Sequence, residues 1–161
     1  MSAKSVEENF FERWNIYKKV IANNYMYHSE IISSIKEKIT HMESLSVLDL
    51  GCGDSYVAAN SISSGQLQSY LGIDTSETAI NFSKNNLSNH RGDVAHINGD
   101  LSELDDLRAK YDLIIAGYSL HHLRTEEKGN CISRISDLLS QNGFFLLLVA
   151  SKNYGLLVQE L

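Results

Sequence analysis

The N-terminal part of the chain carries apolar side chains at intervals of three or four positions, which is the spacing of one face of an α-helix. The polar stretch NNYMYHS interrupts this pattern once. The pattern therefore predicts two helices. Their apolar faces consist of Phe10, Trp14, Tyr17 and Ile21 in the first helix and Ile32, Ile35, Ile39 and Met42 in the second.

The pattern changes near Leu45, after which short runs rich in valine, isoleucine and leucine alternate with segments of helical length. The runs predict five strands at 46–51, 70–76, 94–99, 111–118 and 143–151. The segments SYVAANSIS, ETAINFSKNNL, SELDDLRA and TEEKGNCISRISDLLSQ predict the helices, and the last of them ends at the stop signal Asn142-Gly143.

Two of the runs, DLIIAG and FFLLLVA, are apolar at nearly every position. This is typical of strands in a parallel sheet that helices cover on both faces. The expected fold is α/β, a doubly wound, mainly parallel Rossmann-like sheet of about five strands in one structural domain. Ligands of such sheets bind beyond the carboxyl ends of the strands. In this chain those ends are Asp49 to Ser55, Asp74, Gly99-Asp100 and Gly117 to His122.

The composition fits one globular domain, since 43% of the 161 residues are hydrophobic and 21% are charged. The formal net charge of −6, without a block of Lys and Arg, disfavours a nucleic-acid partner. No apolar run reaches the ~20 residues that span a bilayer, and no signal peptide is evident, so we expect a cytoplasmic protein. Cys52 and Cys131 are expected to be free thiols, and we expect no bound metal.

The stretch VLDLGCGDS separates two kinds of nucleotide site. A dinucleotide fingerprint that begins at Gly51 requires a small residue at position 56, where this chain has Tyr56. Asp49 lies two residues before Gly51. Its carboxylate would repel a pyrophosphate but would attract a ligand that carries an ammonium and a sulfonium group. The stretch therefore favours a cationic ligand over a nicotinamide dinucleotide.

Four blocks in this order resemble the class I S-adenosyl-L-methionine-dependent methyltransferases, over positions 25 to 151. They are VLDLGCGDS, GIDTS, INGDL and YDLIIAGYSLHHL. The fourth block is similar to the branch of the family that methylates small molecules. Many members have a third glycine where this chain has Ser55, and we expect this serine to cap the following helix.

The resemblance implies a role for each block. Gly51, Cys52 and Gly53 would make room for the methionine part of the cofactor beside Asp49. Asp74, followed by Thr75, would hold the ribose hydroxyls. Asp100 and Leu101 would meet the adenine amino group, and Gly117 and Tyr118 would line the exit of the fourth strand. The simpler interpretation of Asp74 and Asp100 is that they cap helices.

The resemblance also implies that residues 1–44 form a helical lid over a core at 45–161. Tyr25, Tyr27 and His28 would then line the substrate pocket or lid, although burial of the tyrosines in a helix junction is an equal alternative. His121 and His122 are candidate catalytic bases, since histidine titrates near neutral pH. A histidine that closes a strand more often has a packing or hydrogen-bonding role.

The expected function is transfer of a methyl group from S-adenosyl-L-methionine to a small-molecule acceptor by direct displacement. The alternative is a non-catalytic binding or assembly module of the same fold. The family's sheet usually has two further strands after the fifth, for which this chain leaves no room before Leu161. Truncation of a longer enzyme is the first interpretation. Pairing of the exposed sheet edge in a homodimer is the second.

Overall fold

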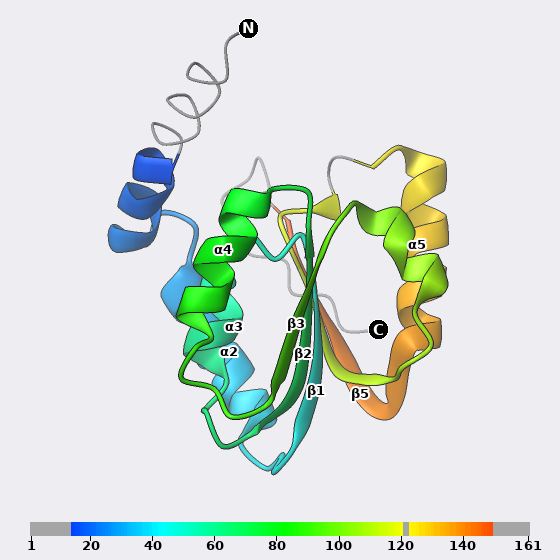
Figure 1. Ribbon diagram of the computed structural model, residues 1–161, viewed down its shortest axis with the longest axis horizontal. Coiled ribbons are helices and arrows are strands. Elements are labelled where there is room, and N and C mark those ends of the chain that lie inside the picture. The colour runs from blue at the N-terminus through cyan, green and yellow to red at the C-terminus, as the bar shows by residue number, and fades with distance from the viewer. Residues whose placement is uncertain (1–13, 121–122, 150–161) are drawn as a thin grey trace, which may run out of the picture.

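The structure, a computed structural model, describes residues 14–120 and 123–149 (Figure 1). Within these ranges, five parallel strands form one sheet in the order β3-β2-β1-β4-β5. The strands are β1 (Leu45–Leu50), β2 (Leu67–Asp74), β3 (Asp93–Asn98), β4 (Tyr111–Gly117) and β5 (Leu139–Leu148). The chain runs outward from β1 to β3 and then returns to β4 beside β1, so the winding reverses between β1 and β4. The predicted doubly wound sheet is confirmed.

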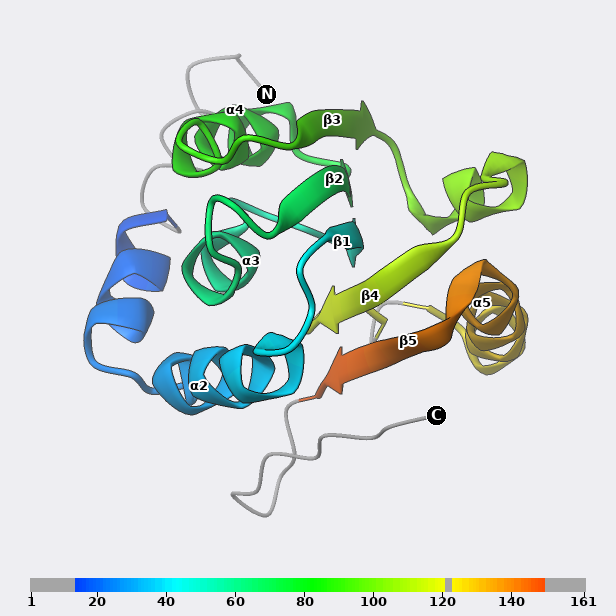
Figure 2. The same cartoon turned by 90° about the horizontal axis from the view of Figure 1, so that it is seen from below.

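Helices cover both faces of this sheet, which Figure 2 shows from below. One face carries α2 (His28–Ile39), α3 (Tyr56–Ser61) and α4 (Glu77–Asn86), and the other carries the 3-10 helix η1 (Leu101–Asp106) and α5 (Thr125–Leu138). A further helical segment at 14–22 precedes α2. None of the helices in the described part of the chain combines the length and the apolar character needed to cross a membrane.

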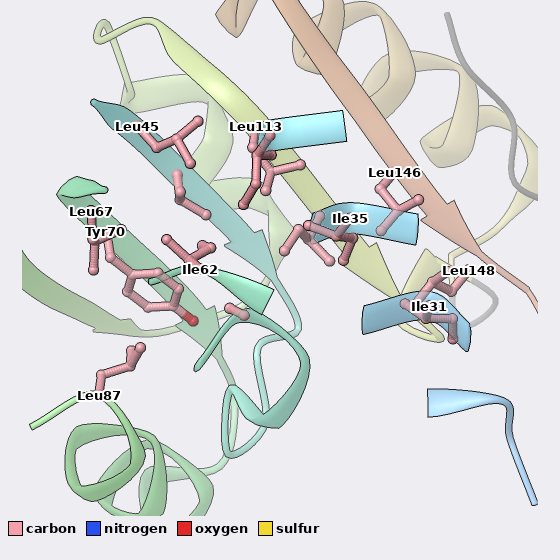
Figure 3. Close-up of a cluster of buried hydrophobic side chains, with 14 residues drawn as sticks. Ile31, Ile35, Leu45, Ile62, Leu67, Tyr70, Leu87, Leu113, Leu146 and Leu148 are labelled. Atoms are coloured by element: carbon pink, nitrogen blue, oxygen red, sulfur yellow. The ribbon is translucent and has the colours of Figure 1, made fainter. Parts of the chain in front are cut away.

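Two layers of apolar side chains, one on each face of the sheet, hold the elements together. In the layer shown in Figure 3, Ile35 of α2 packs in one cluster with Leu113 and Leu146. In the other layer, Ile114 packs in one cluster with Ile135 of α5. Neighbouring residues of β4 thus enter opposite layers, which explains why this strand is apolar at nearly every position.

The buried face of α2 differs from the predicted one in two residues. The sequence pattern placed Ile32 on it, whereas the structure buries His28, Ile31, Ile35 and Ile39. Both Ile31 and Ile32 have helical spacing to Ile35, so the periodicity alone could not separate them. In the structure the core cluster includes Ile31 and Ile39, so the buried row is Ile31, Ile35 and Ile39, at intervals of four. Met42, also predicted on this face, lies beyond the end of the helix and packs partly buried against the same cluster.

The boundary between α5 and β5 was also predicted wrongly. The helix ends at Leu138 rather than at residue 141, and the strand begins at once with Leu139. Pairing of Leu139 with Tyr111 overrides the local stop signal. A side chain at Gly143 would bring its Cβ to 2.7 Å from the Tyr111 carbonyl oxygen. Gly143 therefore marks a close approach of two strands and not the end of a helix. The segment SELDDLRA forms only the short 3-10 helix η1.

Asp112 links three strands, and its removal tests how much this link stabilises the fold. Its carboxylate accepts hydrogen bonds from the Ser46 amide at 3.0 Å and from the Ser140 hydroxyl at 2.7 Å. Asp112→Ala leaves both partly buried donors without this acceptor, so we expect the free energy of unfolding to fall by about 1–3 kcal/mol. Urea denaturation measures the change. The exposed Glu37→Ala is the control, with an expected change below ~0.5 kcal/mol; equal effects of both variants would contradict the prediction.

Candidate functional site

Two adjoining cavities open at the carboxyl ends of the strands. The first has a volume of about 360 Å³ and lies between the turn after β1 and the N-terminal residues 14–28. The second, of about 350 Å³, lies beyond the ends of β2 and β3. Gly51, Gly117 and Tyr118 line both cavities. The two volumes therefore form one elongated site at the place where the winding of the sheet reverses.

The turn after β1 separates the two cavities and requires glycine. Gly51 and Gly53 have φ values of 68° and 53°, which L side chains rarely adopt. A Cβ at Gly51 would also lie 2.4 Å from the Cβ of Ser119, which donates a 2.6 Å hydrogen bond to the Leu50 carbonyl. The amides of Gly51 and Cys52 both donate to the carbonyl of Ile73, at 2.8 and 3.0 Å. The backbone of the turn is thus fixed against β2 and β4.

Ser55 does not cap α3 with its side chain, contrary to the prediction. Its hydroxyl lies 2.5 Å from the Tyr70 hydroxyl and 2.5 Å from that of Ser83. Asp54 accepts an amide hydrogen bond at the start of α3 instead, since its Oδ1 is 3.2 Å from the Tyr56 nitrogen that donates to it. Ser55 has a φ of 57°, so the third glycine of many family members would fit here without strain.

Asp74 connects the turns that follow β1 and β2. One carboxylate oxygen accepts from the Gly53 amide at 2.8 Å, and the other accepts from the Ser76 amide at 2.8 Å. Ser76, and not Asp74, is the N-cap of α4, because its hydroxyl accepts from the Ala79 amide at 3.2 Å. Asp74 therefore holds the glycine turn in place while it also lines the second cavity.

Asp49 is a buried carboxyl group in the wall of the first cavity. Its side chain is only 5% exposed and accepts a 3.0 Å hydrogen bond from the Tyr70 hydroxyl. Burial raises the pKa of Asp49 to about 7, and the charges of Asp74 and Asp54 act in the same direction, whereas the bond from Tyr70 lowers it. Burial likewise raises the pKa of the neighbouring Cys52 thiol, which lines the same cavity.

Aromatic side chains form much of the first cavity's remaining wall. Tyr17 donates a 3.2 Å hydrogen bond to Asp54, and burial raises the pKa of both groups. Trp14, which the sequence pattern assigned to a helix face, stacks on Phe82 at 4.5 Å between ring centroids and also lines the cavity. Sequence reasoning missed the cavity-lining role of Trp14, Tyr17 and Asp54. Helical spacing did mark the two aromatic residues, but it gave no sign of what they face.

Of the residues predicted to line the pocket or lid near the start of α2, His28 lines the first cavity and Tyr25 and Tyr27 do not. Tyr25 and Tyr27 are 70% and 43% exposed and do not line it, whereas Met26 and His28 do. The Tyr118 hydroxyl donates a 3.0 Å hydrogen bond to the Met26 carbonyl, so the segment before α2 is attached to the end of β4. His28 is 4% exposed, and burial lowers its pKa.

All ten residues predicted to bind the cofactor line one or both cavities. They are Asp49, Gly51, Cys52, Gly53, Asp74, Thr75, Asp100, Leu101, Gly117 and Tyr118. The candidate bases His121 and His122 lie outside the described residues. The structure thus brings four separate sequence blocks to one edge of the sheet. Whether the ten residues bind a ligand stays a prediction.

Comparison with protein families gives one match. Residues 47–143 match the family described as "Methyltransferase domain". This range extends from the third residue of β1 to the bulged part of β5, and it includes the glycine turn and the ends of β1 to β4.

Curated relatives are similar at low identity. An uncharacterized methyltransferase of Bacillus licheniformis is 23% identical over 137 residues, which is 83% of this chain and 62% of the relative. A carboxy-S-adenosyl-L-methionine synthase of Campylobacter concisus is 28% identical over 65% of this chain and 44% of its own length. The chain spans about half the length of the curated relatives it matches.

Solved structures share the fold. A magnesium protoporphyrin IX methyltransferase from Synechocystis with bound SAM is 22% identical, with a TM-score of 0.66 over 99% of this chain and 80% of that one. An S-adenosylmethionine-dependent methyltransferase from Clostridium acetobutylicum is 20% identical, with a TM-score of 0.69 over 88% of this chain and 58% of that one. At this level of identity the likeness supports the fold.

The raised pKa of Asp49 predicts a pH dependence of stability. The folded-state pKa lies above the unfolded value of ~3.9, so the stability contribution of this group is complete below pH ~4 and is lost as the pH rises to about 7. Asp49→Asn removes this loss. We expect the variant to gain on the order of 2 kcal/mol relative to the wild type between pH 5 and pH 8.

Urea denaturation of both proteins at the two pH values measures this difference. Asp93→Asn, at an exposed position at the start of β3, is the matched control. A stability difference between Asp49→Asn and the wild type that stays constant from pH 5 to pH 8 would contradict the assignment.

Proposed function

The chain belongs to the methyltransferase domain family, and on this premise we propose that it transfers the methyl group of S-adenosyl-L-methionine to a small-molecule acceptor. The observation that carries the proposal is the elongated site at the ends of β1, β2 and β4, with the glycine turn at its centre. It has two compartments, and Gly51, Gly117 and Tyr118 line both of them.

The charge of the site fits this cofactor better than a dinucleotide. Asp49, Asp54 and Asp74 line the cavities, and among their described lining residues none is Lys or Arg. Such a site repels a pyrophosphate and attracts the ammonium and sulfonium groups of the methyl donor. At Gly51 the space of a Cβ is taken by Ser119, whereas nothing lies within 4 Å of the Cβ position at Gly53, so the backbone of the turn is open to a ligand there.

Each compartment has a proposed share of the cofactor. Asp49 and the turn at Gly51 to Gly53 would hold the methionine part in the first cavity. Asp74 would accept hydrogen bonds from the ribose hydroxyls in the second, where Asp100 and Leu101 would contact the adenine. The bound cofactor supplies an activated methyl group on a sulfonium centre. The chain therefore contributes mainly alignment and the exclusion of water.

The acceptor would bind in the rest of the first cavity. Trp14, Tyr17 and Tyr56 make this part aromatic, and a volume of about 360 Å³ suits a small molecule. Aromatic faces also stabilise a nearby sulfonium. Residues 1–44 would act as a lid over this compartment. A base is required only if the accepting atom must lose a proton, and His121 and His122 stay the predicted candidates.

Binding of the cofactor tests the proposal directly. Isothermal titration of the purified chain with S-adenosylmethionine and S-adenosylhomocysteine should give micromolar-range dissociation constants, while the control ligand NADH should not bind. Binding of NADH without binding of the other two ligands would replace this proposal with a nicotinamide-dependent one. The non-catalytic alternative predicts cofactor binding, or none, without methyl transfer in an acceptor screen.

A variant of Asp74 tests the proposed ribose site. Asp74→Ala should weaken binding of S-adenosylmethionine by about tenfold or more, because charge-assisted hydrogen bonds to the ribose are lost. Asp93→Ala, an exposed aspartate at the opposite end of the sheet, is the matched control and should leave the affinity unchanged. Circular dichroism would establish that both variants are folded. Unchanged affinity of folded Asp74→Ala would remove this residue from the site.

A further inference from the structure

A continuous chain of hydrogen bonds leads from Asp49 away from the first cavity. The Tyr70 hydroxyl donates to Asp49 at 3.0 Å and lies 2.5 Å from the hydroxyl of Ser55. Ser55 lies 2.5 Å from the hydroxyl of Ser83, and Ser83 lies 2.6 Å from Nε2 of His96. The chain thus connects the end of β1 through β2 and α4 to β3, the outer strand of the sheet.

The interior of this chain of hydrogen bonds is closed to solvent. Tyr70, Ser55 and Ser83 are 1%, 2% and 0% exposed, while the terminal His96 is half-buried. Tyr70 lies within the apolar cluster of Figure 3, where its hydroxyl is the polar atom among hydrocarbon side chains. Polar groups at such depth are costly unless each finds a partner. Here each hydroxyl has two.

The number of protons fixes the donor-to-acceptor direction of the hydrogen bonds. A hydroxyl donates one hydrogen bond, so all the hydroxyls must point the same way. If Asp49 is ionised, the donors point toward it, and Nε2–H of His96 donates to Ser83. If Asp49 is protonated, each donor points toward His96, whose Nε2 then accepts. If His96 in the first state also carries a proton on Nδ1, moving one proton from its Nε2 along the three hydroxyls to Asp49 gives the second state.

We propose that Tyr70, Ser55, Ser83 and His96 form a proton relay that stabilises the ionised form of Asp49 and so makes the site prefer the methyl donor, whose sulfur is a sulfonium cation, over the product, whose sulfur is neutral. These four are positioning residues, because they act through Asp49. The inference rests on the function proposed above, since it assumes that the first cavity holds the methionine part of the cofactor. Loss of the sulfonium charge during transfer would then favour release of the product.

Two local features, at Ser55 and at Gly72, support the hydrogen-bond network. Ser55 occupies a positive φ that glycine would adopt without strain, yet its side chain caps nothing and instead bridges Tyr70 and Ser83. Gly72 leaves the space that the network needs. A Cβ there would lie 2.8 Å from Sγ of Cys52 and 3.0 Å from ring atoms of both His96 and Tyr70.

The charges around the two ends are consistent with this relay. Asp49 interacts with Tyr70 and Asp74 of β2, with Cys52 and Asp54 of the turn after β1, and with Tyr17 of the N-terminal segment. The bond from Tyr70 opposes the rise in pKa that burial of Asp49 causes. His96 interacts with Lys84 of α4, and burial together with this charge lowers the pKa of His96. Both effects favour the neutral imidazole of His96, which can exist as either tautomer.

Removal of one hydroxyl tests the selectivity. At pH 7, Tyr70→Phe should weaken binding of S-adenosylmethionine by about tenfold and that of S-adenosylhomocysteine by less, because the product keeps the ammonium group but has lost the sulfonium charge. Titration calorimetry measures both affinities. Tyr111→Phe, which removes a hydroxyl from a buried tyrosine of β4 outside the network, is the matched control. Equal losses for the two ligands, or no loss for either, would overturn the proposal.

Variants at the far end separate the relay from packing. His96→Gln keeps a donor toward Ser83 and should retain most of the preference for S-adenosylmethionine. His96→Leu has no donor and should lose this preference to the same extent as Tyr70→Phe. If the two His96 variants have the same ratio of affinities, the relay does not extend to His96 and the proposal is wrong.

A measurement without ligand distinguishes failure of the relay from failure of the proposed function. Nuclear magnetic resonance titration gives the pKa of His96 in the wild type, in Asp49→Asn, in Tyr70→Phe and in the double variant. Asp49→Asn should lower this pKa in the wild-type background and leave it nearly unchanged in the Tyr70→Phe background. An equal drop in both backgrounds would indicate coupling through space and would refute the relay. If the four pKa values show coupling through Tyr70 but the protein does not bind the cofactor, only the proposed function is refuted.

Discussion

The close approach of backbone segments after β1 is the constraint on which the site depends. The Gly51 turn lies against Ser119 on one side and is hydrogen-bonded to the Ile73 carbonyl on the other, and Asp74 holds its second glycine. These contacts join the ends of β1, β2 and β4. A side chain at position 51 would push the segments apart, because both the φ angle and the space exclude it. The two cavities exist because this turn is narrow.

The second constraint is the cost of burying charge. Asp49 lies at the end of a strand with almost no exposure, where its ionised form is destabilising. The hydrogen bond from Tyr70 offsets part of this cost, and a bound cation would offset more. The stability of the fold therefore depends on a carboxylate that also lines the candidate site. This trade-off is common at functional sites, where a group is kept in a state that the fold alone would disfavour.

The N-terminal segment adds a wall that the sheet does not provide. Tyr118 holds this segment through the Met26 carbonyl, and Tyr17 reaches Asp54 on the far side of the cavity. Two contacts between residues distant in sequence thus bring an aromatic surface over the ends of the strands. Because α2 packs into the same core layer as the sheet, the segment before it has a fixed starting point.

The sequence by itself determined the doubly wound sheet and the edge of the sheet at which the candidate site residues gather. Strands apolar on both faces require helices on both sides, and glycines and aspartates at strand ends are local signals. Tertiary structure decided the rest. It selected Ile31 over Ile32, began β5 at Leu139 despite Gly143, and turned Ser55 from a predicted cap into a bridge. These outcomes depend on partners far away in sequence, and periodicity specifies which side chains share a face but not what that face meets.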